Sequence, residues 1–580
     1  MILDFCDDSN LDDSSKNIFK QIINKNGEIF SNFITESSQP YHKNLKWWVS
    51  LPASRNNFSS ELYYNFCICE FIKYLIKENK KIDEIKIKSK ALAKILKLYF
   101  RKKRLKVIIS IHSNEKRYKL KKYHSYLSIN FINIYLRFLF YQFLKLSYAK
   151  LTKIYINKKI NLEKDLTLID TYLLSEYIEK DRYYSGLLDK LDQQFLKKIY
   201  FVPTIVLNNS TDRKNLFKIF IKLRTAKKKY LIKEDYLSFY DIFITSLFFL
   251  NICFLKKIKF IYNEVDYYNL IKEDLLSVKG YGLSFEGLIN YKFIRNLKRK
   301  NILIKNFIDW WENQSLDKGI HYALNKFYPK SNVSGYLGYV PRSLEINLLP
   351  TNKEIQSGII PKKIGVIGKG FINLIKSYSN NIEVTDYPAL RFNHLWNSEN
   401  EKINDEDKKL ILIALPILLK ESIDILDLVM KSLENSNNSN FYFIVKNHPA
   451  IDQKIILNHF KTVWPDEFSF TNENTGTLLK KINFMISGIS SICMECLALG
   501  KPLIIVEKDK CLKFNPIPKE VSANIRVETS NVKDLLFYIK KFSNLNDKEK
   551  KIIVDEGNNI KNKYFTKPSI KKINEMLNIL

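Results

Sequence analysis

Glycine is scarce in this chain, with 16 residues in 580. That leaves too few glycines for a dinucleotide-binding fingerprint or a P-loop, so neither phosphate-binding motif is expected. The segment Gly368-Lys369-Gly370 follows a predicted strand, and a tight turn is favoured there over an anion cradle. Any nucleotide site in this chain must therefore use other chemistry.

Cysteine is also rare, and the seven residues are scattered along the sequence. Cys67 and Cys69, like Cys493 and Cys496, fall within periodic apolar segments, where thiols are usually small core residues. The second pair has metal-like spacing but lies in a predicted helix, and no other pair completes a zinc site. A reduced protein is expected, and the sequence has no cluster of histidines and carboxylates that predicts a metal.

Long apolar runs are missing as well. Residues 123–136 and 242–255 are uncharged for 14 residues each, whereas a membrane-spanning helix needs about 20 apolar residues. The first residues lack a basic start followed by an apolar run, so no secretory signal is expected. These features predict a cytoplasmic protein, and the run 242–255 is expected to be a buried helix.

Acidic residues are outnumbered, at 61 against 94 lysines and arginines, which gives a net charge of +33. About half of the excess lies in residues 91–160, where Glu115 is the single acid. This basic segment is also rich in aromatic residues. An interfacial helix on an anionic membrane and a core helix flanked by solvated lysines explain it about equally well. Nucleic-acid binding is a weaker explanation, because no zinc-finger spacing or RNP-like motif accompanies the charge.

The length and the alternation of short apolar runs with helical patterns predict two domains of α/β class. Each would be Rossmann-like, and two such domains facing a cleft form the architecture called GT-B. The expected boundaries are residues 1–396 for the first domain, with 91–160 as a helical basic insertion, 397–409 for a polar linker, and 410–580 for the second domain. Predicted strands are 46–51, 106–111, 166–172, 198–206, 302–309, 362–367, 410–415, 441–445, 468–471, 484–487, 503–506 and 525–527.

Two segments of the second domain are expected to form a binding site. Phe441 to Pro449 and Phe484 to Pro502 each read as a buried strand that ends at a polar turn, and ligands bind at the carboxyl ends of strands in open α/β sheets. In the second segment, Gly488, Ser490 and Ser491 precede a predicted helix. The amides at a helix N-terminus and two hydroxyls suit a phosphate, although plain N-capping by serine is also common.

His448 strengthens this prediction. Pro449 keeps the preceding residue out of helical conformation, so the imidazole is presented at the strand end. A histidine there can neutralise or protonate a departing phosphate, and Lys446 can assist it. Glu495 lies a little over one turn into the helix that follows Ser491, close enough to accept hydrogen bonds from a ribose.

The pair His448-Pro449 and Ser490-Ser491 resembles the HP and SS motifs of bacterial GT-B enzymes that use cytidine nucleotides. These include sialyltransferases, capsule Kdo transferases and CDP-glycerol glycerophosphotransferases. More of the chain is similar to bacterial surface carbohydrate biosynthesis proteins. The matching stretches are 47–58, 181–187, 311–318 and 388–396.

The resemblance implies that His448, Ser490 and Ser491 hold a CMP phosphate and that Glu495 meets the ribose. Sialyltransferases also carry an acidic-acidic-Gly motif that supplies the base, and this chain departs from it because Phe285 precedes Glu286-Gly287. Glu312 is the first substitute, since it follows a predicted strand and precedes Asn313 and Gln314. Those two residues, with Arg55, Arg391 and His394, are expected to bind the acceptor or the sugar, unless they are structural polar residues.

Together these features predict an inverting, metal-independent glycosyltransferase that needs no cofactor. It would transfer an acidic sugar of the sialic acid or Kdo type from a CMP donor to a lipid-linked or polysaccharide acceptor. It would lie at the inner face of the cytoplasmic membrane as a peripheral protein. The alternatives are a CDP-glycerol-type alditol phosphate transferase and a noncatalytic basic protein that binds membrane or nucleic acid.

Overall fold

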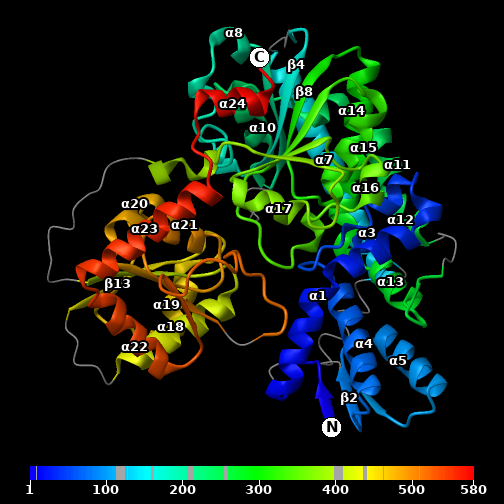
Figure 1. Cartoon of the computed structure of the whole chain (residues 1–580). Helices are drawn as coiled ribbons and strands as arrows, with labels where there is room; N and C mark the ends of the chain where they lie inside the picture. Colours follow the sequence, from blue (N-terminus) through cyan, green and yellow to red (C-terminus); the bar gives the residue numbers. More distant parts are fainter. Residues whose placement is uncertain are drawn as a thin grey trace.

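The structure is a computed structural model that describes residues 1–7, 10–112, 125–126, 128–157, 162–206, 214–253, 259–396, 409–434, 440–461, 463–507 and 510–579. Figure 1 shows two large lobes and a smaller N-terminal unit. The predicted linker, apart from Lys409, lies outside the described residues. No helix in the described ranges combines the length and the apolar content needed to cross a membrane.

The second lobe is built on a six-stranded parallel sheet in the order β14-β13-β12-β15-β16-β17. In chain order this is 3-2-1-4-5-6, a common order of dinucleotide-binding folds, and it places a switch point between β12 and β15. The strands are β12 (Lys409–Ala414), β13 (Phe441–Lys446), β14 (Phe468–Phe470), β15 (Phe484–Ser487), β16 (Leu503–Val506) and β17 (Arg526–Thr529). All six lie where the sequence predicts them.

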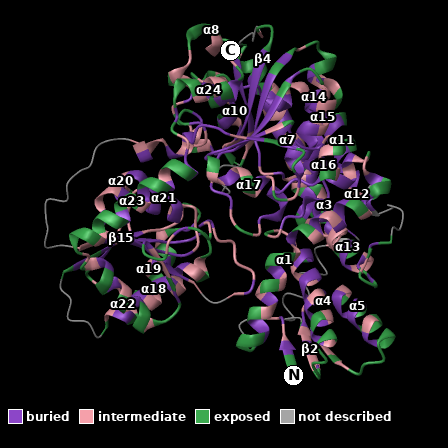
Figure 2. Cartoon of the chain, viewed as in Figure 1, coloured by how far each residue is buried: buried purple, intermediate pink, exposed green. Residues whose placement is uncertain are grey.

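Helices cover both faces of this sheet, in which β15 and β16 are fully buried (Figure 2). Buried parallel strands of this kind need a layer of helices on each side. The helices are α18 (Leu419–Leu433), α19 (Gln453–His459), α20 (Thr475–Lys481), α21 (Ile492–Ala498), α22 (Val532–Ser543) and α23 (Asp547–Tyr564).

The first lobe has its own six-stranded sheet, β11-β10-β9-β8-β4-β5, in which every pairing is parallel. Its switch point lies between β4 and β8. The strands are β4 (Leu166–Leu173), β5 (Ile199–Ile205), β8 (Ile304–Trp310), β9 (Asn332–Leu337), β10 (Lys363–Val366) and β11 (Glu383–Asp386). Two Rossmann-like lobes of this kind confirm the GT-B fold class.

Helices also surround this sheet. They are α7 (Ile129–Ile156), α8 (Gln193–Leu196), α10 (Leu216–Thr225), α11 (Phe239–Ser246), α12 (Phe248–Cys253), α14 (Tyr281–Arg299), α15 (Ser315–Phe327), α16 (Asn352–Gln356), α17 (Ile372–Ile375) and the 3-10 helix η9 (Leu390–Trp396). Helix α13 (Tyr268–Leu275) lies toward the N-terminal part of the chain. A small antiparallel pair, β6 (Ile261–Tyr262) and β7 (Val265–Asp266), precedes α13. The closest packing is between α14 and α15, where Gly287 and Gly319 bring the two backbones together.

The smaller N-terminal unit has a three-stranded parallel sheet, β1 (Ile2–Asp4), β2 (Glu84–Ile87) and β3 (Ile108–Ile111). Helices α1 (Asp13–Ser37), α4 (Leu62–Lys77) and α5 (Lys90–Lys102) accompany it. The basic segment 91–160 thus contributes α5 and β3 to this unit and α7 to the first lobe, while 113–124, 127 and 158–160 lie outside the described residues.

The strand predicted at 46–51 is wrong. Residues Leu45–Trp48 and Leu51–Ser54 form the short helices α2 and α3. Asn44 caps α2 by accepting a hydrogen bond from the backbone N–H of Lys46, and Pro52 occupies the first turn of α3, where proline favours a helix start. Trp47 and Trp48 are both fully buried, so burial on all sides produced an apolar run that resembled a strand.

The end of the chain returns to the first lobe (Figure 1). After α23, the backbone N–H of Thr566 bonds to the carbonyl of Ile367, and the carbonyl of Thr566 accepts from the N–H of Ala389. Helix α24 (Ile570–Leu577) follows, and Lys572 lies 3.2 Å from the carboxylate of Asp386. The chain therefore connects the two lobes at two points.

Candidate functional site

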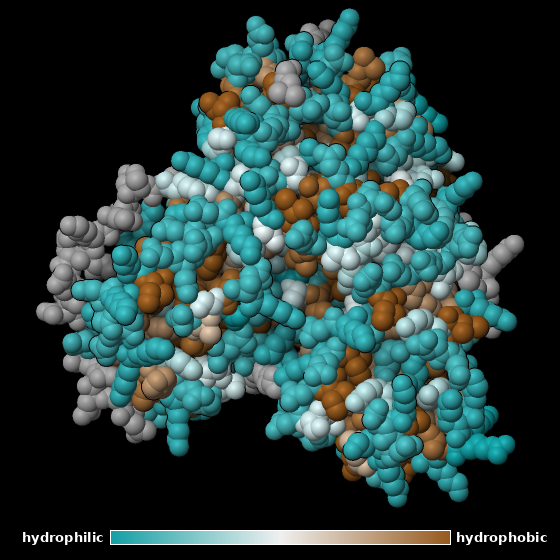
Figure 3. All heavy atoms as spheres, viewed as in Figure 1, coloured by the Kyte–Doolittle hydropathy of each residue, from teal (hydrophilic) through white to brown (hydrophobic). Residues whose placement is uncertain are grey.

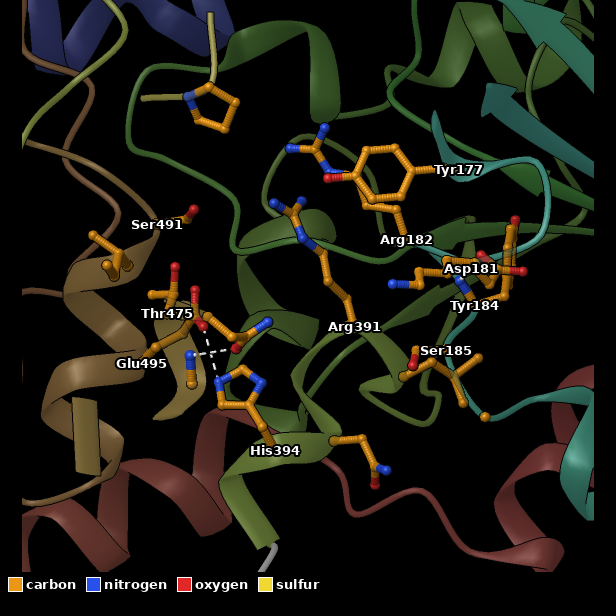
Figure 4. Close-up of a pocket in the computed structure, with 18 of the residues that line it drawn as sticks. Tyr177, Asp181, Arg182, Tyr184, Ser185, Arg391, His394, Thr475, Ser491 and Glu495 are labelled. Atoms are coloured by element: carbon orange, nitrogen blue, oxygen red, sulfur yellow. Dashed lines mark hydrogen bonds and ion pairs between the residues drawn. The ribbon is translucent and has the colours of Figure 1, made fainter. Parts of the chain in front are cut away.

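A pocket of about 870 Å³ lies between the two lobes. The space-filling view shows the molecule hollowed between the second lobe and the remainder (Figure 3), and Figure 4 shows side chains that line the pocket. Three parts of the first lobe line the pocket. The loop after β4 supplies Tyr177 and residues 179–182 and 184–189, the segment after α10 supplies Lys228, and η9 supplies Leu390, Arg391, Asn393 and His394. From the second lobe come Ala414, Leu415, residues 446–449, 474–476, 490–492 and Glu495.

The second-lobe wall consists of loops that follow β12, β13, β14 and β15. All four strands are parallel, so these loops meet at the carboxyl edge of the sheet, on either side of its switch point. The first-lobe wall includes the loop that follows β4, beside the switch point of the other sheet. Both lobes therefore present the edge at which α/β folds bind ligands.

His448 is oriented by its own turn. Its Nδ1 accepts a hydrogen bond of 3.1 Å from the backbone N–H of Ala450, so in the neutral ring the proton resides on Nε2. Burial lowers the pKa of His448, and the positive charges of Arg182 and Arg391 lower it further. The pocket thus holds a neutral imidazole whose Nε2–H is available as a donor at neutral pH.

Ser490 and Ser491 lie directly before α21. Ser491 occupies the capping position, but its side chain makes no capping hydrogen bond. No side-chain hydrogen bond of either hydroxyl was found among the described residues. Capping therefore does not account for these serines, and both hydroxyls line the pocket.

Glu495 and His394 lie across the lobe boundary from each other. His394 Nε2 is 3.0 Å from Glu495 Oε2, and Figure 4 shows this contact at the base of the pocket. Gly476 permits it, because a side chain at that position would meet the His394 ring at 2.8 Å. The sequence suggested separate roles for these two residues, whereas the structure places them in contact.

Two arginines extend into the pocket from the first lobe. Figure 4 shows the guanidinium groups of Arg182 and Arg391 pointing into the same space, with Arg182 next to Tyr177. The guanidinium carbon of Arg182 lies 5.6 Å from the centre of the Tyr177 ring. Asp181 does not neutralise them, since it accepts hydrogen bonds from the backbone of Tyr183 and Tyr184 and from Lys228.

Lys446 and Gly488 support the second-lobe wall. Lys446 lines the pocket and donates to the carbonyl of Glu473 at 2.7 Å, and burial lowers its pKa. Gly488 is not among the lining residues. A side chain there would meet Ile425 and Pro416 at 3.2 and 3.3 Å, so glycine lets the turn before α21 pack closely on the lobe's interior.

Arg55 and Asn313 lie elsewhere, inside the first lobe. Arg55 is fully buried and forms a 2.6 Å ion pair with Glu354, and it also donates to the carbonyls of Ile346 and Leu349. The Asn313 side chain is buried and donates to the carbonyl of Asn347 at 2.7 Å. Neither residue lines the pocket, and the structure gives both a packing role.

Glu312 follows β8, as the sequence predicts, but it does not line the pocket either. Its carboxylate accepts hydrogen bonds from Trp310 Nε1 at 3.1 Å and from Gln314 Nε2 at 2.6 Å. Burial raises its pKa, and the nearby charge of Glu345 adds to the effect. The side-chain amide of Gln314 therefore holds the Glu312 carboxylate in place.

Four carboxylates do line the pocket: Glu179, Asp181, Asp189 and Glu495. Asp181 and Glu495 are engaged as described above. Glu179 and Asp189 are exposed, and in the described part of the chain no hydrogen bond or ion pair was found for either. These two are the acidic groups on the first-lobe wall that remain available to a ligand.

Several pocket residues were not predicted as site residues. Arg182 lies in the stretch 181–187, which matches the family resemblance but suggested no role. Asn474 and Thr475 follow β14 and begin α20. His448 and Ser490 were predicted because each follows a strand and lies in a short polar turn. Residues 471–476 show the same pattern, which could have identified Asn474 and Thr475.

No group of three or more histidine, cysteine, aspartate or glutamate side chains in the described residues could hold a metal ion. Cys67, Cys69, Cys493 and Cys496 are buried and unbridged. They are the small core residues that the sequence predicts. The pocket can therefore supply a neutral imidazole, hydroxyls, arginine guanidinium groups and carboxylates to a ligand.

No protein-family model and no curated protein sequence matches the chain. Solved structures do resemble it. The UDP-GlcNAc 2-epimerase from Neisseria meningitidis, bound to UDP-GlcNAc, is 13% identical, covers 72% of this chain and 99% of its own, and gives a TM-score of 0.42. The S. aureus MnaA–UDP structure is 12% identical, covers 72% of this chain and 98% of its own, and gives a TM-score of 0.41. The wall teichoic acid polymerase TagF is 11% identical, covers 81% of this chain and 97% of its own, and gives a TM-score of 0.39. Such low similarity says nothing about what this chain binds.

Proposed function

We propose that the chain is a glycosyltransferase of surface polysaccharide or glycolipid synthesis that uses a CMP-activated acidic sugar. One observation supports this most strongly. His448, Ser490 and Ser491, which resemble the motifs of such enzymes, line a single pocket with two first-lobe arginines at the switch points of both sheets. A pocket of this size and charge suits an anionic nucleotide donor.

In the proposed complex, the second lobe holds the nucleotide. The Nε2–H of His448 and the hydroxyls of Ser490 and Ser491 donate hydrogen bonds to the phosphate oxygens. Glu495 accepts from the ribose hydroxyls and exchanges its contact with His394 for them. Arg182 and Arg391 bind the sugar carboxylate, for which guanidinium geometry is well suited.

The reaction is a direct displacement with inversion. The oxygen of the acceptor hydroxyl bonds to the anomeric carbon as the bond from that carbon to the phosphate oxygen of CMP breaks. The hydroxyl proton passes to a carboxylate of the first-lobe wall, and the electron pair leaves with CMP, whose charge His448 stabilises. Because a base must reach the acceptor, Asp189 is a better candidate than Glu312, and Glu179 is the other lining carboxylate.

The test is a thermal-shift panel of CMP, CDP, UDP, GDP and their sugars on the full chain. The expected result is stabilisation by CMP and by a CMP-linked acidic sugar, and its loss in His448→Ala and in the double variant Ser490→Ala with Ser491→Ala. His459→Ala is a matched control, because His459 is exposed in the same lobe and lies outside the pocket.

Each alternative function predicts a different pattern. Stabilisation by CDP-glycerol without any CMP-sugar would replace the proposal with an alditol phosphate transferase. If no nucleotide stabilises the chain, or if His448→Ala keeps the full shift, the nucleotide site is wrong. The acceptor is proposed to be lipid-linked or a polysaccharide, and the protein to work at the membrane surface.

A further inference from the structure

Helix α7 exposes an apolar stripe along its length. Phe131, Tyr135 and Phe138 face α12 and α14, where they contact the Phe249 and Tyr281 rings. The opposite side carries exposed apolar residues in two groups, each spaced three or four residues apart as on one helix face, with a gap between Phe140 and Leu151. They are Ile132, Leu136, Phe140, Leu151 and Ile154.

Helix α11 continues this apolar surface. The ring of Phe143 on α7 packs against Phe239 on α11, with centroids 5.6 Å apart, so the two helices meet along the edge of the stripe. Four apolar or aromatic residues on successive turns of α11 are exposed: Phe239, Tyr240, Phe243 and Ile244. The exposed fraction reaches 69% for both Phe140 and Tyr240, which is unusual for side chains of this size.

The run 242–255 was expected to be a buried helix, and the structure corrects this. Leu247 ends α11, and α12 begins at Phe248. Ile242 and Phe248 are buried, but Phe243, Ile244 and Leu250 are exposed. The described part of the run, residues 242–253, therefore has both buried and exposed side chains, while 254 and 255 lie outside the described residues.

A basic pocket of about 430 Å³ adjoins this apolar surface. Ile244 belongs to both, and Thr245 and Phe248 form the pocket's wall on that side. The other lining residues include four lysines and two tyrosines, and they are Lys43, Asn44, Leu45, Lys46, Leu288, Tyr291, Lys292, Tyr322 and Lys326.

These lysines have no neutralising partners in the pocket. No acidic residue is among its lining residues, and no ion pair of the four ammonium groups was found in the described part of the chain. Asp241 on α11, whose charge acts on Lys292, is itself bound to Arg295 at 3.0 Å. Lys46 and Lys292 are half-buried, and burial lowers the pKa of both, whereas Lys43 and Lys326 are exposed.

We infer that this face of the first lobe, formed by α7, α11 and the four-lysine pocket, docks onto an anionic phospholipid bilayer. The exposed aromatic and aliphatic side chains enter the interfacial region, and the lysine pocket receives the phosphate of a lipid headgroup. A protein partner would account for the apolar surface alone. The combination of an apolar stripe with an uncompensated cationic pocket matches a bilayer surface, where acyl chains and phosphates lie side by side.

The inference is independent of the nucleotide site, and it is tested with vesicles. The full chain is sedimented with vesicles of phosphatidylcholine alone and with vesicles that also contain about one third phosphatidylglycerol. Binding is expected with the anionic vesicles and not with the neutral ones. Two double variants remove the two parts of the surface: Phe140→Ser with Phe243→Ser, and Lys46→Ala with Lys292→Ala.

Each double variant is expected to lower the vesicle partition coefficient about tenfold or more, since each lysine near an anionic surface contributes several-fold. Controls remove exposed side chains of the same types from the second lobe. Phe537→Ser in α22 and Lys548→Ala with Lys551→Ala in α23 should bind like the original chain. Unchanged thermal unfolding midpoints establish that every variant is folded.

Three results would overturn the inference. One is equal binding of the original chain and both double variants to anionic vesicles. Another is a concentration-dependent dimer that both double variants abolish while vesicle binding is absent, which would assign the surface to a second copy. The last is tight binding to duplex DNA that the lysine variant loses and the phenylalanine variant keeps.

Discussion

Replacing Glu354 with glutamine tests the buried charge cluster on which the first lobe depends. Glu354 lies 2.6 Å from Arg55 and 3.0 Å from Lys318, and all three side chains are completely buried. Its carboxylate also accepts a hydrogen bond from the backbone N–H of Thr351 at 3.0 Å. The cluster joins α3, α15 and α16, so its loss affects three elements at once.

The magnitude follows from the electrostatics of the cluster. Burial opposes ionisation of Glu354, but the charges of Arg55 and Lys318 outweigh it and lower the pKa from 4.5 to about 2. A shift of this size corresponds to about 3 kcal/mol of stability. The variant also leaves two buried cations without an anion, and breaking a buried pair typically costs about 3 to 5 kcal/mol.

Urea unfolding followed by tryptophan fluorescence measures the effect, because Trp47, Trp48, Trp310 and Trp311 are all buried in this part of the molecule. Since the folded pKa lies below the usual value, the stabilisation is present above pH 4.5 and is lost as pH falls toward about 2. The difference between the original chain and the variant should therefore shrink over that range.

Glu383→Gln is the matched control. Glu383 pairs with Lys363 at 2.8 Å, but its side chain is 64% exposed, and exposed pairs contribute about 1 kcal/mol or less. The electrostatic reasoning is refuted if Glu354→Gln loses no more stability than this control, or if its loss does not diminish in acid.

Further predictions concern the pocket. Arg182→Ala should raise the pKa of His448, measured by NMR titration of the imidazole, because the arginine charge lowers it; an unchanged pKa would place Arg182 too far away to matter. Glu312→Gln should leave transfer activity within a few-fold while Asp189→Asn reduces it at least about a hundredfold, and the reverse order would restore Glu312 as the base. EDTA should leave nucleotide-dependent stabilisation unchanged, and a loss that Mg²⁺ restores would contradict a metal-independent site.

The second-lobe strands β12, β13, β15 and β16 were predictable because each is a largely apolar run that ends at a polar turn. Two strands of the first sheet were not. Strand β9 contains Ser334 and Gly335 and reads as a turn, although Gly335 is needed because a side chain there would meet Trp311 at 2.8 Å. Strand β11 lies at the sheet edge and begins and ends with charged residues, Glu383 and Asp386.

The pocket residues likewise fall into a predictable group and an unpredictable one. Lys446 ends β13, and His448, Ser490 and Ser491 come within four residues of a strand end, so local sequence locates them at one edge of the sheet. The first-lobe wall depends on a long loop after β4, whose path the sequence does not specify. Arg55 shows the limit most clearly, because its partner Glu354 lies 299 residues away in the chain.

The second crossing of the chain affects how the lobes can move. Residues 566–572 are tied to Ile367, Asp386 and Ala389 of the first lobe, next to the start of η9. These contacts anchor the segment that follows α23 to the first lobe, so this point stays fixed when the second lobe moves. A ligand would then enter the pocket by rotation of the second lobe about the anchored segment.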